Sequence, residues 1–92
     1  MEFQKEPGRI FALGEDDKLL AEITFPTGED GVADIDHTFV DESLRGQGVA
    51  SQLVRAAAAE LRAQGKRAKT SCWYAAQWFE KHPQEQDLLY KE

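Results

Sequence analysis

Hydrophobic and polar residues follow a short period in the first half of the chain. Runs rich in β-forming residues alternate with Gly, Pro and Asp, and they predict strands at Arg9–Leu13, Lys18–Phe25 and Val32–Val40. Side chains of a regular strand alternate between its two faces. One face of the third predicted strand would therefore carry Ala33, Ile35, His37 and Phe39.

The second half changes to the helical period. Val49–Gln64 places apolar residues three and four positions apart, contains four consecutive alanines and is followed by the helix-stopping Gly65. After it, Ala68–Cys72 is predicted as a strand and Tyr74–Lys81 as a helix ended by Pro83. The residues from Gln84 onward are expected to form a tail, with Leu88, Leu89 and Tyr90 as its anchors.

The predicted element order is β-β-β-α-β-α, which indicates a mixed α+β (α/β) fold with a mostly antiparallel sheet. The first three strands would form a meander. A helix that connects two strands of one sheet makes them parallel, with a right-handed crossover. The third and fourth strands are therefore expected to form a parallel pair. The length of 92 residues predicts a single domain over residues 1–92.

Composition excludes several classes of function. The net charge is −6, with 17 acidic and 11 basic residues, whereas non-specific nucleic-acid binding needs a cationic surface. No apolar run approaches the roughly 20 residues of a membrane span, and the first residues do not resemble a signal peptide. With Cys72 as the single cysteine, a reducing cytoplasm is the expected compartment. The two histidines and one cysteine lack zinc-ligand spacing, so no metal is expected.

The strongest candidate for chemistry is the loop between the third strand and the long helix. Two glycines let this backbone turn sharply, and the helix that follows begins with unpaired N–H groups and a partial positive charge. Such a helix start binds phosphate or pyrophosphate, and Arg45 adds a full charge. The alternative is a strand-to-helix connection without a ligand. The candidate binding residues are Leu44, Arg45, Gly46, Gln47, Gly48, Val49, Ala50 and Ser51.

Arg45, Gly48 and Ala50 satisfy the pattern R-x-x-G-x-A. This pattern resembles the acetyl-CoA pyrophosphate loop of the GCN5-related N-acetyltransferases. The resemblance extends over about residues 18–83, because the strand, long helix, strand and shorter helix follow in the family's order. The short chain, its Asp36-His37-Thr38 segment and its single cysteine are most similar to the very small, single-domain members, the YjdJ-type group.

The resemblance implies roles for individual residues. Acetyl-CoA would be the cosubstrate, with its pyrophosphate on the backbone amides of the glycine loop. The main chain of Phe39 and Val40 would pair with the pantetheine amides. In this branch, His37 and Cys72 occupy the positions of the proposed active-site pair. Many larger members carry a tyrosine that protonates the leaving thiolate, and Phe79 stands at that position here.

The residues themselves leave alternatives open for this pair. His37 is either a core-facing histidine or a general base, for which an ordinary pKa of about 6.5 is suitable at neutral pH. Cys72 is either a small buried apolar residue, a thiol that accepts the acetyl group, or a proton donor to the departing CoA thiolate. The acidic residues around Asp36 are either a solvated surface or an attraction for a cationic amine.

The sequence thus predicts an N-acetyltransferase that moves an acetyl group from acetyl-CoA to an amine, either a small molecule or a protein. One alternative is a non-catalytic module that binds or senses acetyl-CoA. Another is an interaction module without a cofactor, in which the glycines only shape a turn.

Overall fold

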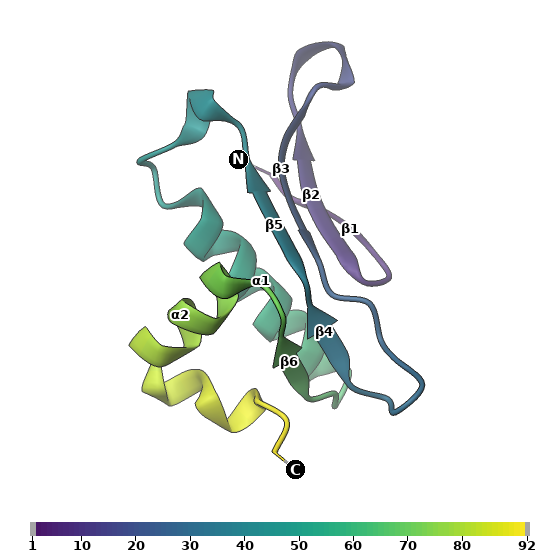
Figure 1. Cartoon of the computed structure of the whole chain (residues 1–92). Helices are drawn as coiled ribbons and strands as arrows, with labels where there is room; N and C mark the ends of the chain where they lie inside the picture. The colour runs from purple at the N-terminus through teal and green to yellow at the C-terminus, as the bar shows by residue number, and fades with distance from the viewer. Residues whose placement is uncertain (1, 92) are drawn as a thin grey trace.

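The antiparallel part of the fold is a four-stranded sheet with the order β1-β2-β3-β5. The computed structural model describes residues 2–91 and is shown in Figure 1. The strands of this sheet are β1 (Gln4–Glu6), β2 (Arg9–Leu13), β3 (Leu19–Thr24) and β5 (His37–Val40). The predicted meander of three strands is confirmed as β2-β3-β5, and β1 extends it by a strand that the apolar pattern does not reveal.

A second, two-stranded sheet pairs β4 (Ala33–Ile35) with β6 (Ala68–Thr70) in parallel. The helix α1 (Val49–Ala63) lies between them in the chain and provides the crossover. The predicted parallel pair is therefore confirmed. A second helix, α2 (Trp73–Lys81), follows β6 directly.

The prediction of one regular strand over Val32–Val40 is wrong. The chain changes partners at Asp36, where β4 ends and β5 begins, and the Asp36 N–H donates to the Thr24 carbonyl oxygen at 3.2 Å. The interruption reverses the alternation of side chains. Ala33 and Ile35 are buried, but His37 and Phe39 are exposed on the opposite face.

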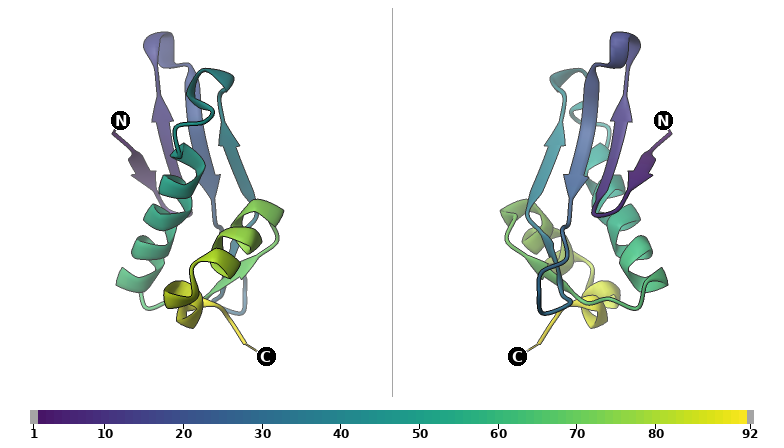
Figure 2. Two further views of the ribbon diagram at one scale, coloured as in Figure 1. Left: turned by 90° about the vertical axis from the view of Figure 1, so that its left-hand side faces the viewer. Right: turned by 90° about the vertical axis from the view of Figure 1, so that its right-hand side faces the viewer.

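The helices cover only one face of the antiparallel sheet, as both views of Figure 2 show. Helix α1 presents its apolar stripe to this face, and Leu53 in this stripe is fully buried. The backbone turns out of the helix at Gly65, whose positive φ of 68° suits glycine. The buried core contains Ile10, Ala12, Ala21, Ile23, Leu53, Val54, Ala57, Leu61, Trp78 and Phe79.

The C-terminal residues are more ordered than the tail that the sequence predicts. Residues Pro83–Leu88 form the 3-10 helix η3, and Leu88 is buried, as expected of an anchor. The Tyr90 N–H donates to the Ala68 carbonyl oxygen at 2.8 Å. This bond and the neighbouring bridge from Leu89 to Ala68 add a contact alongside β6. No helix within residues 2–91 is long and apolar enough to cross a membrane.

Leu53→Ala should destabilise the fold by about 2–5 kcal/mol, because it removes a buried side chain and leaves a cavity under α1. Urea unfolding monitored by circular dichroism measures this loss. The neighbouring exposed Gln52→Ala is the matched control and should change stability by less than about 0.5 kcal/mol. A loss in Leu53→Ala as small as that of the control would contradict the described core.

The ion pair that joins η3 to α1 should make stability depend on acidity. The Arg62 guanidinium donates to both Asp87 carboxylate oxygens at 2.8 Å and lowers the pKa of Asp87 from 3.8 to about 2. A lowered folded-state pKa gives a contribution that is present above the unfolded value and is lost as pH falls towards the folded value. The contribution is small, because the Asp87 side chain is 64% exposed.

We therefore expect wild type to have a slightly higher urea midpoint than Asp87→Asn at about pH 6. This difference should shrink as the pH falls through the range from 3.8 to about 2. Equal midpoints at both acidities would show that the pair contributes nothing measurable.

Candidate functional site

A hollow of about 480 Å³ opens where the two sheets part. β5 bonds to β3 on one edge, and within residues 2–91 its other edge has no strand partner. That free edge faces the segment from β6 into α2. The hollow is lined by Asp36, His37, Thr38, Val40, Arg45, Ala50, Ser71, Cys72, Trp73 and Tyr74.

The loop that enters the hollow from β5 is braced by Asp41. The Asp41 carboxylate accepts from the Ser43 N–H at 3.1 Å and from the Ser43 hydroxyl at 2.6 Å. These hydrogen bonds hold the pKa of Asp41 below its ordinary value. They shape the short 3-10 helix η2 (Glu42–Leu44), whose Leu44 packs against the core.

The predicted glycine loop then leads directly into α1. Gly46 and Gly48 have φ values of 82° and 74°, in the left-handed region that L side chains rarely adopt. A β-carbon at either position would have no atom within 4 Å, so the backbone angle and not crowding explains these glycines. Gly48 is the N-cap, and no side chain caps the helix. The first-turn N–H groups of α1 are therefore open to a ligand, beside the exposed Arg45.

Ser51 has a structural contact that its spacing does not reveal. Its hydroxyl oxygen accepts from the indole N–H of the buried Trp78 at 2.8 Å. The Trp78 ring stacks on His82 with centroids 4.0 Å apart, and His82 Nδ1 lies 2.6 Å from the Trp78 carbonyl oxygen. The contact ties the first turn of α1 to α2. His82 is the C-cap residue of α2.

Cys72 lies at the N-cap of α2, half-buried at the wall of the hollow. Its backbone N–H donates to the Ile35 carbonyl oxygen at 3.0 Å. The Asp34 carboxylate accepts from the Ser71 N–H at 3.1 Å and from its hydroxyl at 2.7 Å. The thiol is thereby presented on a fixed backbone, with its Sγ 3.5 Å from the Thr38 Oγ1.

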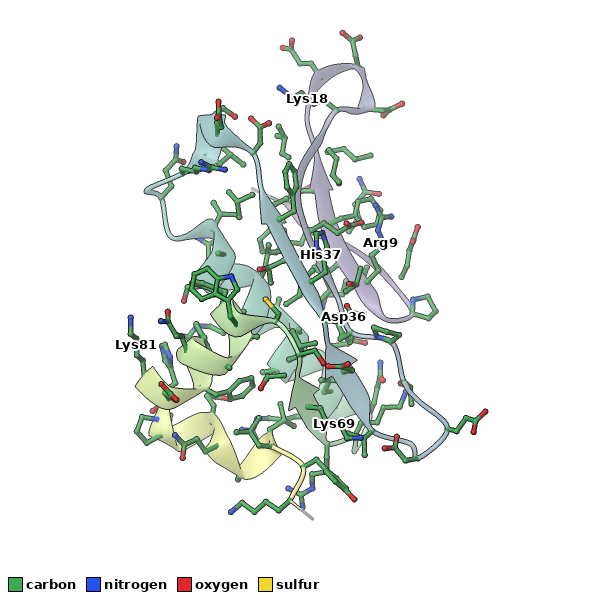
Figure 3. All side chains as sticks on the ribbon, in the orientation of Figure 1. Arg9, Lys18, Asp36, His37, Lys69 and Lys81 are labelled. Carbon is green, nitrogen blue, oxygen red and sulfur yellow. The ribbon has the colours of Figure 1, made fainter. Side chains whose placement is uncertain are left out.

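His37 lines the same hollow from the outer face of the sheet. Its side chain is 53% exposed, so the alternative of a core-facing histidine is wrong. Its Nε2 lies 3.5 Å from the Glu22 Oε1, and the other Glu22 oxygen accepts from Arg9 Nε at 2.5 Å. Figure 3 shows His37 and Arg9 on this face. Within residues 2–91 no hydrogen bond joins His37 to Cys72 directly.

Five residues that line the hollow were not among the predicted catalytic or cofactor-binding residues: Asp36, Thr38, Ser71, Trp73 and Tyr74. Thr38 lies on the inner face because of the break at Asp36, so regular alternation assigns it to the wrong side. Tyr74 lines the hollow beside Cys72, and burial raises the pKa of its phenol, which therefore stays protonated at neutral pH. Phe79, in contrast, is 1% exposed in the core and outside the lining of the hollow.

Phe39 and Val40 complete the set of predicted binding residues. Both lie on β5, with the exposed Phe39 opposite Glu22 and the half-buried Val40 opposite Ala21. In the part of the chain that the structure describes, no three His, Cys, Asp or Glu side chains are placed to hold a metal ion.

Comparisons with solved structures give the same fold. A Staphylococcus aureus protein described as GCN5-like superimposes with a TM-score of 0.80 at 28% identity, over 99% of this chain and 89% of its own. A Pyrococcus furiosus protein described as an acetyl transferase gives 0.61 at 26% identity, covering 97% and 62%. A Bacillus anthracis protein described as a streptothricin acetyltransferase, in complex with acetyl coenzyme A, gives 0.59 at 20% identity, covering 83% and 47%.

A comparison with curated proteins gave no significant match. The family model of the GCN5-related N-acetyl-transferases, however, matches residues 10–88. This range includes the glycine loop, both helices, β2 from Ile10 onward and strands β3 to β6. With this match and the parted sheets described above, the chain belongs to the GCN5-related N-acetyltransferase family.

Proposed function

We propose that this protein binds acetyl-CoA in the hollow between β5 and α2 and transfers the acetyl group to an amine. The main support is that a single hollow joins the two parts of the site. It extends from the glycine-loop residue Arg45 and the α1 residue Ala50 to Cys72. The Bacillus anthracis structure, which shares this fold, contains acetyl coenzyme A.

The cofactor would be held by backbone groups more than by side chains. Its pyrophosphate fits the open N–H groups at the start of α1, where the helix dipole and Arg45 supply positive charge. Its pantetheine amides would pair with the free edge of β5 at Phe39 and Val40. Backbone pairing along a free strand edge orders a flexible chain, and it places the thioester near Cys72.

The chemistry requires one proton to leave the amine and one to reach the thiolate. The neutral amine nitrogen attacks the thioester carbon, a C–N bond forms, and the C–S bond breaks to give the CoA thiolate. His37 would accept the amine proton, with Glu22 orienting its ring. The Cys72 thiol would protonate the departing thiolate, and the Tyr74 hydroxyl is a second proton donor in the same hollow.

A non-catalytic acetyl-CoA-binding module is the second candidate function. It is favoured by Phe79, because the position expected for a tyrosine proton donor holds a buried apolar ring. This candidate predicts saturable CoA binding without acetyl transfer. Binding and turnover measured on the same preparation separate the two candidates.

Gly48→Ala should weaken acetyl-CoA binding about five- to thirtyfold, the equivalent of about 1–2 kcal/mol. An L residue disfavours the left-handed backbone at this position, so the loop relaxes and must be reordered when the ligand binds. Titration calorimetry measures the affinity.

Gly65→Ala is the matched control for that measurement. Gly65 also has a left-handed φ and open space around its α-carbon, but it lies at the far end of α1. Its substitution should leave the affinity for acetyl-CoA unchanged. Equal affinities for wild type and both variants would contradict the proposed cradle.

Cys72→Ala should lower kcat by about 10²-fold or more if its thiol protonates the leaving group, with the dissociation constant of CoA unchanged. Chromatographic detection of CoA and acetylated amine avoids the reaction of thiol reagents with Cys72 itself. Thr38→Val should lower kcat to a smaller extent, because it removes the hydroxyl 3.5 Å from Sγ, and Thr38→Ser should restore it. If Cys72→Ala retained the wild-type kcat, the thiol would have no role in the mechanism.

A further inference from the structure

The hollow is bounded by opposite charges at its two ends. Arg45 and Ala50 border it where the glycine loop enters α1, and Asp36 borders it where β5 begins. Asp36 and Val40 are four positions apart, which corresponds to about 13 Å along an extended strand. A polyanionic cofactor is attracted to the first end and repelled from the second.

Among the described residues that line the hollow, Asp36 carries the only carboxylate. Its Oδ1 accepts from the Thr24 hydroxyl at 2.5 Å, which orients the group. Within residues 2–91 no basic side chain forms an ion pair with it. The neighbouring carboxylates already have partners. Asp34 accepts a hydrogen bond from the Ser71 hydroxyl, and Asp30 forms an ion pair with Lys69 at 2.8 Å.

Asp36 is also next to the groups of the proposed reaction. It precedes His37 in the chain, and both residues are labelled at the β4–β5 junction and on β5 in Figure 3. Both line the hollow that contains the Cys72 thiol. A cation that pairs with Asp36 would therefore lie at the border of the hollow, next to the proposed base.

We propose that Asp36 is the acceptor-binding residue, and that the acceptor is a cationic primary alkylamine that enters at this end of the hollow. This inference rests on the proposed function, because it names the acceptor class of the same site. The ammonium pairs with Asp36 and gives one proton to His37, whose exposed ring releases it to solvent. The neutral amine then attacks the thioester carbon, the C–N bond forms as the C–S bond breaks, and the nitrogen loses its second proton to His37. The products are the N-acetyl amine and CoA, whose thiolate receives a proton from Cys72.

The binding test uses the full chain saturated with CoA and an NMR titration with n-butylammonium chloride. Saturable shifts are expected at the backbone amides of Asp36, His37 and Thr38. The uncharged analogue n-butanol should produce none. Asp36→Asn keeps an oxygen for the Thr24 hydroxyl but loses the charge, and it should abolish the shifts.

The kinetic test measures KM and kcat for n-butylamine with acetyl-CoA. Asp36→Asn should raise KM about two- to fivefold, as expected for one partly exposed ion pair, with kcat and the affinity for CoA little changed. Asp36→Glu keeps the charge and should retain most of the wild-type KM. Asp16→Asn is the matched control: it removes an exposed carboxylate in the β2–β3 turn, at the opposite end of β3.

A free alkylamine and a lysine side chain present the same ammonium group. A second kinetic arm therefore uses a short peptide with one lysine and a blocked N-terminus. The KM for both acceptors should depend on Asp36. The acceptor with the lower KM shows whether the ammonium group belongs to a free alkylamine or to a lysine side chain. An unchanged KM for both acceptors in Asp36→Asn, with CoA bound normally, would overturn the acceptor site alone. Absence of CoA binding in wild type would overturn the proposed function, and this inference with it.

Discussion

The change of strand partners at Asp36 is the constraint on which the site depends. One continuous segment must bond to β3 through β5 and to β6 through β4, so the two sheets cannot remain joined along their full length. The free edge of β5 and the hollow beside it are the direct consequence. The opposite wall is fixed by the Cys72–Ile35 backbone bond and by the Asp34 carboxylate on Ser71.

The packing of α1 on the sheet also fixes the position of the glycine loop. The helix is held on the sheet by fully buried residues such as Leu53, so its first turn cannot move independently of β5. Gly48 allows the sharp entry into the helix, and the Ser51–Trp78 hydrogen bond locks that turn to α2. Open backbone donors are thereby held at one end of the hollow, with no side chain of the helix capping them.

The groups of the proposed reaction come from segments that are distant in the sequence. His37 and Thr38 lie on the two faces of β5, and Cys72 begins α2. His37 is supported by Glu22 on the outer face, whereas Cys72 contacts Thr38 on the inner face. In this arrangement the proposed base and the proposed proton donor lie on opposite sides of the strand edge. An amine and a thioester that meet at this edge could each reach one of them.

The parallel pair followed from the rule that a helical crossover joins parallel strands. Local pattern alone determined the long helix, the β2-β3-β5 meander and the glycine loop, because periodicity, turn residues and glycine dihedral preferences are properties of neighbouring residues. It did not reveal β1 or η3, whose residues are mainly polar and which are held by pairing with β2 and by Arg62. Only the tertiary structure decided which face His37 occupies and that Thr38 meets Cys72. Both depend on the break at Asp36. It arises because the segment before Asp36 pairs in one sheet and the segment after it pairs in the other, and it has no local signature in the sequence.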